Sequence, residues 1–493
     1  MPGGFRTLAC RRVYFAAESG PRQAPLGAVI HSKNNVSARK LSAELTRPAP
    51  ATAGLIEEAM SAHRNKQPDV ARARYEAALA IDPEHPDALH LLGLLEAQSG
   101  DLDRAAELIG SAVAVKPLEP MFHNNLGNVC LLSERLDDAE RHYRQALELD
   151  PMRLDAMNNV CVLLGRRGEF EAAEQAWSRL LEAAPTFTQA RHNLATLYMR
   201  MGRLFDALQQ CDRGLITAPR DTGLRALLGF AYGAQGLREQ AAQVYTDWLR
   251  DEPGNAVASH HLAAVTAEGV PERASDAYVK CTFDRFADSF DARLAQLSYR
   301  APELVAQALG QVLGTPARAL RIADAGCGTG LCGPLLAPYA ASLVGVDLSS
   351  RMLAKAAKVG LYDELVQSDL VELFAARPAE FDVVASADTL CYFGALEPVA
   401  AAAATALRGP ACFVFTVESM SDEAAAAGYL LQYNGRYQHR RDYVAGVLED
   451  AGFDVVEMQA QVLRKEMGVP VNGWLVSARR GVDAGTEVWS VNV

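Results

Sequence analysis

Apolar and small residues in the first half of the chain recur in columns spaced 34 positions apart. One column is always alanine: Ala71, Ala105, Ala139, Ala173, Ala207 and Ala241. A second column holds small residues, such as Gly127, a third holds larger ones, such as Tyr143, and proline recurs from Pro83 to Pro253. Small residues are needed where two helices cross closely, and proline follows a helix that it cannot continue. The pattern predicts six helical hairpins over residues 52–253 and a capping helix over residues 256–266.

These columns resemble the tetratricopeptide (TPR) pattern, which implies a solenoid whose first helices line a concave, partner-binding face. Asn125, Asn159 and Asn193 fall on the first helices of three successive repeats, in a column that resembles the one in the TPR arm of O-linked N-acetylglucosamine transferases. A primary amide offers a donor and an acceptor together, which matches one peptide unit of an extended chain. We therefore expect the three asparagines to bind a polypeptide ligand in the TPR groove. An ordinary solvated polar face is the alternative.

Beyond residue 276 the pattern changes to short apolar runs that alternate with helical segments. The runs expected to be strands lie at about 319–324, 342–347, 364–368, 381–386 and 411–417, and a final pair at 454–459 and 473–478. Such alternation predicts a parallel α/β sheet covered by helices. Ligands of these sheets bind outside the carboxyl ends of the strands, so the residues that follow each run are candidate site residues.

The first of these runs leads directly into a glycine-rich turn. Asp324, Gly326, Gly328 and Gly330 give the pattern D-x-G-x-G-x-G. Residues without a Cβ tolerate positive φ and let a ligand approach the backbone closely. The spacing differs from the dinucleotide pattern G-x-G-x-x-G, and no Walker lysine follows. The turn therefore indicates a nucleotide-like cofactor that is not bound through a pyrophosphate, although the glycines alone would also fit a tight loop in any doubly wound fold.

Together with Asp347, which ends the next apolar run, this stretch resembles the first motif of class I S-adenosylmethionine (SAM) methyltransferases. The resemblance implies a Rossmann-like domain with a seven-stranded, mostly parallel sheet whose last strand is antiparallel. It also implies that SAM is the cofactor and that Asp347 accepts hydrogen bonds from both ribose hydroxyls, a role that suits an acceptor-only carboxylate.

The same resemblance assigns further contacts to the cofactor. Asp369 would meet the adenine amine, with Leu370 stacking nearby, or would simply cap a helix. Met352 would pack on the adenine or in the core. Arg300 would pair with the methionine carboxylate of SAM or lie on the surface. The full expected set is Arg300, Asp324, Gly326, Cys327, Gly328, Gly330, Asp347, Leu348, Met352, Asp369 and Leu370.

The catalytic candidates are Asp388, Tyr392 and His439. Asp388 and Tyr392 follow the fourth expected strand, and His439 precedes the last helix, where substrate-facing loops lie in this fold. His439 could accept a proton near neutral pH, or it could be structural. Amino-methylating nucleic-acid enzymes carry N/D-P-P-Y/F after the fourth strand, and the chain lacks it there.

Charge and composition narrow the partners and the compartment. The formal net charge of −12 argues against nucleic acid as the main partner, since neutralising phosphates needs a basic face. The nine cysteines are scattered without a C-x-x-C pair, so we expect neither a disulfide framework nor a metal site. No run of 18 apolar residues occurs, so no membrane span is expected, and a cytoplasmic location is the simplest expectation.

The sequence thus predicts an α plus α/β chain with five parts. These are a disordered extension over 1–50, with a transit peptide as the alternative, TPR repeats with a cap over 52–266, a linker over 267–276, a methyltransferase domain over 277–480 and a tail over 481–493. We expect a methyltransferase that acts on a protein or small-molecule acceptor. The alternative is a TPR adaptor whose SAM-binding domain is not catalytic, and the glycine spacing disfavours a nicotinamide dehydrogenase.

Overall fold

The computed structural model describes residues 50–287, 290–421, 425–466 and 469–481. The expected N-terminal extension and C-terminal tail therefore lie almost wholly outside the described residues. The chain divides into two compact units, with the boundary between Asn193 and Leu194. The last repeats thus belong to the same unit as the sheet.

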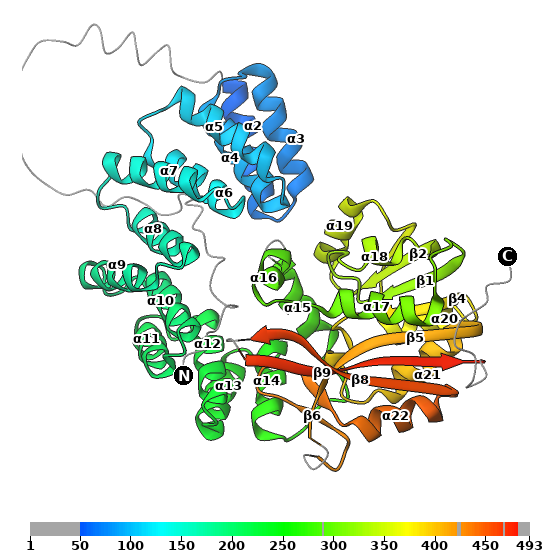
Figure 1. Ribbon diagram of the computed structural model, residues 1–493. Helices are drawn as coiled ribbons and strands as arrows, with labels where there is room; N and C mark the ends of the chain where they lie inside the picture. Colours follow the sequence, from blue (N-terminus) through cyan, green and yellow to red (C-terminus); the bar gives the residue numbers. More distant parts are fainter. Residues whose placement is uncertain (1–49, 288–289, 422–424, 467–468, 482–493) are drawn as a thin grey trace, which may run out of the picture. The chain divides into compact units, whose positions relative to one another are not determined.

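The first unit consists of antiparallel helix pairs (Figure 1). Its helices are α2 (Pro50–Arg64), α3 (Pro68–Ile81), α4 (Pro86–Ser99), α5 (Leu102–Val115), α6 (Pro120–Leu132), α7 (Leu136–Leu149), α8 (Leu154–Arg167), α9 (Phe170–Ala183) and the start of α10 (Thr188–Arg200). The small-residue and bulky columns of the sequence meet where two helices pair. On α6 and α7, a Cβ on Gly127 would lie 2.6 Å from the ring of Tyr143. Only glycine lets α6 and α7 approach this closely.

The asparagine column lies inside the solenoid rather than on an open groove. Asn125, Asn159 and Asn193 are 0%, 1% and 3% exposed. Asn159 donates to Asn124 Oδ1 at 3.0 Å, and Asn193 donates to Asn158 Oδ1 at 3.0 Å, each reaching the preceding repeat. The sequence placed these residues on the right helices but could not tell that their amides point toward the neighbouring repeat. Their buried positions do not support the expected role in gripping a ligand.

The second unit begins with the remaining helical repeats and continues through three connecting helices. The helices are α11 (Leu204–Thr217), α12 (Thr222–Ala234), α13 (Arg238–Asp251), α14 (Ala256–Thr266), α15 (Asp276–Phe286), α16 (Phe290–Gln296) and α17 (Ala301–Leu313). The segment expected to be a linker is bonded to the sheet domain, since the Ala274 amide donates to Tyr392 O and the Gly394 amide donates to Glu272 O, both at 2.8 Å. Its glycine and proline predict a turn but say nothing of such partners.

A sheet of nine strands among the described residues forms the rest of the second unit (Figure 1). The strands are β1 (Leu320–Ala325), β2 (Ala340–Asp347), β3 (Glu364–Gln367), β4 (Phe381–Ser386), β5 (Leu407–Ser419), β6 (Tyr429–Leu431), β7 (Tyr437–His439), β8 (Val455–Glu466) and β9 (Val469–Arg480). The parallel order is β3-β2-β1-β4-β5, and β9 pairs antiparallel with β5 and β8. The fold class predicted from the sequence, a helical solenoid followed by a Rossmann-like domain, is confirmed, with the β6–β7 hairpin as an unexpected addition.

Helices cover both faces of this sheet. The covering helices after β1 are α18 (Gly333–Leu336), α19 (Ser350–Val359), α20 (Leu370–Ala376), α21 (Glu397–Ala406) and α22 (Arg441–Asp450). Ile322 packs with α17 on one face, and its neighbour Ala323 packs in the cluster that holds α20, α21 and α22 on the other. This alternation follows from the period of two along a strand.

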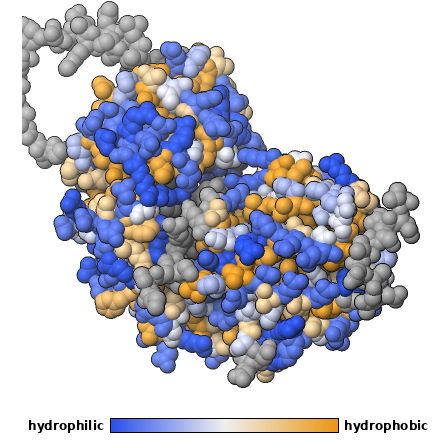
Figure 2. Space-filling view, viewed as in Figure 1, coloured by the Kyte–Doolittle hydropathy of each residue, from blue (hydrophilic) through white to orange (hydrophobic). Residues whose placement is uncertain are grey.

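On the face shown in Figure 2, hydrophilic and hydrophobic residues are interspersed, and single exposed apolar residues such as Leu118 and Ile216 are ordinary on protein surfaces. Among the described residues, no helix is both long and apolar enough to cross a bilayer.

Candidate functional site

A cavity of about 1030 Å³ lies in the second unit, at the carboxyl ends of the parallel strands. Its lining includes the glycine turn after β1, Asp347 at the end of β2 and Asp388 after β4. It also includes Phe230 of α12 and His261 of α14, which belong to the repeat helices. The volume is at the upper end of the range for one small ligand. The cavity therefore has room for a cofactor and part of a second molecule.

The glycine turn provides the cofactor end of the cavity. Gly326, Gly328 and Gly330 all have positive φ, at 78°, 55° and 91°. A Cβ on Gly326 would lie 2.1 Å from Thr389 Oγ1, so this glycine is needed for packing within the protein. At Gly328 the nearest atom to such a Cβ would be Phe290 Cε1, 3.9 Å away. The turn thus leaves open space above Gly328, the arrangement that a bound ligand requires.

Asp347 is fixed beside this space by the turn itself. Its Oδ2 accepts a hydrogen bond from the Gly328 amide at 3.0 Å, and its Oδ1 accepts one from the Ser349 amide at 2.8 Å. Burial raises the pKa of Asp347, while these backbone bonds oppose the shift. A carboxylate has about four acceptor positions, more than the backbone amides occupy, so it can still accept from ligand hydroxyls. The residues present therefore fit the nucleoside part of SAM.

Asp324 lies behind the turn and is not among the residues that line the cavity. Its side chain is buried, and Oδ2 accepts a hydrogen bond of 2.7 Å from the hydroxyl of Tyr362. Burial raises the pKa of Asp324 to about 7, although the bond from Tyr362 lowers it. Its position supports a role in holding the turn rather than in touching a ligand.

The other expected cofactor contacts divide into two groups. Leu348, Asp369 and Leu370 line the cavity, as Cys327 does, but Met352 is buried outside it. Asp369 is the N-cap of α20, because Oδ1 accepts from the amides of Val371 and Glu372. Both of its expected uses, capping and facing the cofactor, are therefore compatible with the structure.

Two arginines are placed differently from what the sequence analysis expected. Arg273, in the former linker, lines the cavity, and its Nη2 lies 3.5 Å from Asp369 Oδ2. Arg300 is exposed at the start of α17 and does not line the cavity, so its position gives no support to the expected pairing with the methionine carboxylate. The sequence carried no signal for Arg273, since it follows neither a strand nor a motif.

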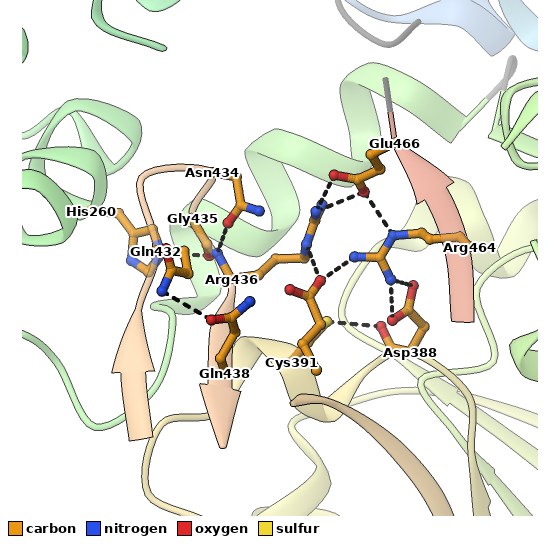
Figure 3. A network of polar contacts seen from close by, with 11 residues as sticks. His260, Asp388, Cys391, Gln432, Asn434, Gly435, Arg436, Gln438, Arg464 and Glu466 are labelled. Carbon is orange, nitrogen blue, oxygen red and sulfur yellow. Dashed lines mark hydrogen bonds and ion pairs between the residues drawn. The ribbon is translucent and has the colours of Figure 1, made fainter. Parts of the chain in front are cut away.

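The other end of the cavity holds a cluster of buried and partly buried ion pairs, which we call the charge cluster: Asp388, Glu418, Arg436, Arg464 and Glu466. Figure 3 shows these contacts and labels Asp388, Arg436, Arg464 and Glu466. Arg464 Nη1 lies 2.7 Å from both carboxylate oxygens of Asp388, and its Nη2 donates to Glu418. Arg436 donates from Nε to Glu418 at 2.6 Å and from Nη2 to Glu466. Arg464 Nε also donates to Glu466 at 2.7 Å.

Electrostatics within the charge cluster reflect burial and pairing. Burial raises the pKa of Asp388, although Arg464 acts in the opposite direction. Burial would also raise the pKa of Glu466, but Arg436 and Arg464 together lower it to about 2. Glu418 follows the fifth expected strand. The expectation that site residues follow the carboxyl ends of strands would therefore have identified it if applied to this strand. Arg436, Arg464 and Glu466 come from other elements and could be found only from tertiary structure.

The other two catalytic candidates differ in their surroundings. Tyr392 lines the cavity, with its ring centroid 5.3 Å from that of Phe283, and burial raises its pKa well above the usual value. His439 is fully buried, does not line the cavity and has its Nε2 3.1 Å from Gly394 O. Burial lowers the pKa of His439 to about 4. The structure brings Asp388 and Tyr392 to the cavity but not His439.

This fold and glycine turn are those of a methyltransferase domain, and comparisons with known proteins agree. A family model described as "Methyltransferase domain" matches residues 323–415. A tetratricopeptide repeat model matches residues 62–126, and a model of the middle TPR-like domain of cilia and flagella-associated protein 70 matches residues 97–250. The chain therefore combines TPR repeats with a methyltransferase domain.

Individual relatives cover parts of the chain. Human methyltransferase-like protein 27 is 36% identical over 118 residues, which are 24% of this chain and 47% of that protein. The ubiquinone biosynthesis O-methyltransferase of Thiobacillus denitrificans is 29% identical over 193 residues, 34% of this chain and 80% of that protein. Among solved structures, the type IV pilus biogenesis factor PilW covers 42% of this chain and 96% of its own, with 24% identity and a TM-score of 0.38.

Proposed function

We propose that the chain is a SAM-dependent methyltransferase that acts on a protein or small-molecule acceptor. The observation that carries this proposal is the open space above Gly328. The Asp347 carboxylate borders this space, and the Gly328 amide holds it in place by a hydrogen bond. The cavity continues from there to the charge cluster, which gives room for an acceptor beside the cofactor.

The residues of the cofactor end have distinct tasks in this proposal. Asp347 accepts from the ribose hydroxyls, Asp369 meets the adenine amine, and Leu348 and Leu370 supply apolar contact to the base. When bound, SAM supplies a methyl group activated by a sulfonium. The glycine turn orients this ligand against the acceptor.

Alignment supplies most of the rate enhancement in this account. Positioning can contribute ~7–11 kcal/mol to such a displacement. A general base adds only ~10²- to 10⁴-fold. Asp388 lines the cavity and is suitably placed to receive a proton. Tyr392 also lines it, but its raised pKa keeps the phenol protonated, so it serves as a hydrogen-bond donor. His439 acts instead by holding the hairpin against Gly394.

The TPR repeats recruit a polypeptide partner or the substrate itself, in a cytoplasmic setting. This part of the proposal is supported by the repeat architecture, which commonly serves as a binding surface.

Calorimetric titration of the full chain with SAM, S-adenosylhomocysteine and NAD tests the proposed cofactor. We expect SAM and S-adenosylhomocysteine to bind at one site and NAD to give no heat of binding. Binding of NAD without S-adenosylhomocysteine would contradict the proposal. Binding of S-adenosylhomocysteine without methyl transfer from tritiated SAM to any lysate fraction would favour the non-catalytic adaptor instead.

A further inference from the structure

The end of the cavity that holds the charge cluster, which we call the acceptor end, has aromatic walls from several elements. Phe230 of α12, Tyr433 of the β6–β7 turn and Trp474 of β9 all line it, as do Tyr278 and Tyr392. The rings of Phe230 and Tyr433 meet edge to face with centroids 5.3 Å apart. Aromatic faces carry negative charge and attract cations within about 6 Å of the ring centroid. These walls therefore suit an apolar stem that ends in a cation.

The charge cluster at this end is acidic in sum, because three carboxylates oppose two guanidinium groups. Glu418 is only 1% exposed but lines the cavity. Its Oε1 accepts from both arginines, and its Oε2 makes no hydrogen bond to any residue within the described ranges. At the cofactor end, Asp347 and Asp369 outnumber Arg273. His261 lines the cavity beside Tyr433, and burial lowers its pKa to about 4, so it adds no positive charge.

An anionic acceptor would fit poorly at this position. Arg464 already donates to Asp388, Glu418 and Glu466, so its guanidinium is occupied. Arg436 is shared between Glu418 and Glu466. A carboxylate or phosphate would have to displace these partners and would leave buried carboxylates without a counter-charge, which is costly.

The repeat helices are structural members of this site. His260 Nε2 lies 2.9 Å from Gly435 O, and His261 Nδ1 lies 3.0 Å from Tyr433 O, so α14 holds the β6–β7 turn. A Cβ on Gly233 of α12 would lie 3.0 Å from Tyr433 Cβ, which shows how closely the turn packs on this helix. An acceptor at the charge cluster therefore contacts the last repeat as well as the methyltransferase domain.

We propose that the methyl acceptor is a primary amine on an aliphatic stem, as in a lysine side chain, with Glu418 facing the nitrogen and Phe230 and Tyr433 along the stem. This inference rests on the proposed function and names the substrate class for the same cavity. In the transfer, the ammonium first loses one proton to a carboxylate of the charge cluster, and the carboxylate passes this proton to solvent. A nitrogen–carbon bond forms while the sulfur–methyl bond breaks, and its electron pair stays on sulfur.

Peptide libraries test the acceptor class directly. The full chain is incubated with tritiated SAM and degenerate peptides whose fixed central residue is lysine, N-acetyl-lysine, serine or glutamate, with free lysine in a parallel arm. Acid hydrolysis and chromatography then identify the labelled residue. We expect Nε-methyllysine, with at least tenfold more label in a lysine arm than with N-acetyl-lysine. Stronger labelling of peptides than of free lysine would identify a polypeptide source, and the reverse a metabolite source.

Other outcomes would overturn the inference. Label that is released by base as methanol, label in the serine arm, or no label with lysine although S-adenosylhomocysteine binds would each exclude an amine acceptor. Failure to bind S-adenosylhomocysteine, or binding without label in any lysate fraction, would instead remove the proposed function itself, so the two failures are distinguishable.

Two variants connect the result to the named residues. Phe230→Ala is expected to raise the KM for the lysine peptides about tenfold without changing the affinity for S-adenosylhomocysteine. The matched control is Phe205→Ala, in the neighbouring α11, because Phe205 is 68% exposed and does not line the cavity. Glu418→Gln should weaken peptide binding to the S-adenosylhomocysteine complex in calorimetry. Equal behaviour of the two phenylalanine variants would contradict the assigned site, even if Glu418→Gln fails to fold.

Discussion

The Gly328 amide donates a hydrogen bond of 3.0 Å to Oδ2 of Asp347, which joins the turn after β1 to the end of β2. This bond fixes the carboxylate beside the open space that the glycine leaves. The two features that the sequence offers as separate motifs are therefore one structural unit. A ligand that binds above the turn meets an acceptor whose direction is already set.

The two glycines of the turn should respond differently to alanine. Gly326→Ala places a Cβ 2.1 Å from Thr389 Oγ1, so we expect a clear fall in the temperature of unfolding. Gly328→Ala meets only Phe290 at 3.9 Å, so the protein should stay folded with a cost of about 1 kcal/mol for the positive φ. Its affinity for S-adenosylhomocysteine should nevertheless fall sharply. Differential scanning calorimetry and ligand titration measure both effects, and equal loss of stability would contradict this distinction.

Asp324 should make the stability of the protein depend on pH. Its pKa is about 7 in the folded protein against 3.8 for the free side chain, so between these values the folded state binds a proton that the unfolded state releases. Stability therefore falls as pH rises from about 4 to 7, by on the order of 4 kcal/mol in total.

Asp324→Asn tests this dependence because an amide oxygen can still accept from Tyr362. We expect the variant to melt at a higher temperature than the original chain at pH 8 but not at pH 4. Asp363→Asn removes a carboxylate at the other end of the sheet, where Oδ2 accepts from the Leu343 amide, and serves as the control. A variant that is less stable at pH 8 would show that the ionised carboxylate is stabilising.

The sequence predicted local features well because each was written in a short pattern. The repeat columns specified the hairpins, and D-x-G-x-G-x-G specified the turn between β1 and α18. Short patterns do not specify where a side chain points. The sequence analysis therefore missed that Asn159 faces the preceding repeat and that Arg300 faces solvent. The three-residue strands of the β6–β7 hairpin are too short to show a period. The charge cluster brings together β5, β8, the β6–β7 turn and the loop after β4, and no local pattern connects them.

The charge cluster should be more important for stability than an exposed ion pair. Arg464 is 2% exposed, and Arg464→Met would leave Asp388 and Glu418 buried with fewer partners, at a cost of about 3–5 kcal/mol. Arg377→Met breaks a pair with the half-exposed Glu364 and should cost less than about 1 kcal/mol. Thermal unfolding of both variants measures the difference. Comparable midpoints would mean that the cluster contributes little to folding.

Asn159 should stabilise the solenoid. Its amide donates to Asn124 and Asn128 of the preceding repeat, so Asn159→Ala would leave buried acceptors without this donor and should cost about 1–3 kcal/mol. Gln175→Ala, at an exposed position on α9, is the control and should change the stability little. An Asn159→Ala variant that melts normally but loses a polypeptide partner would favour the open groove over the buried contact.

Titration of S-adenosylhomocysteine into the original chain, Asp347→Asn and Asp363→Asn tests the central claim most directly. The account predicts that Asp347→Asn binds about 10- to 100-fold more weakly, because hydrogen bonds to a charged acceptor are lost, while Asp363→Asn binds normally. Equal affinity of all three proteins, or no binding to any, would contradict the assignment of a SAM site to the turn and this carboxylate.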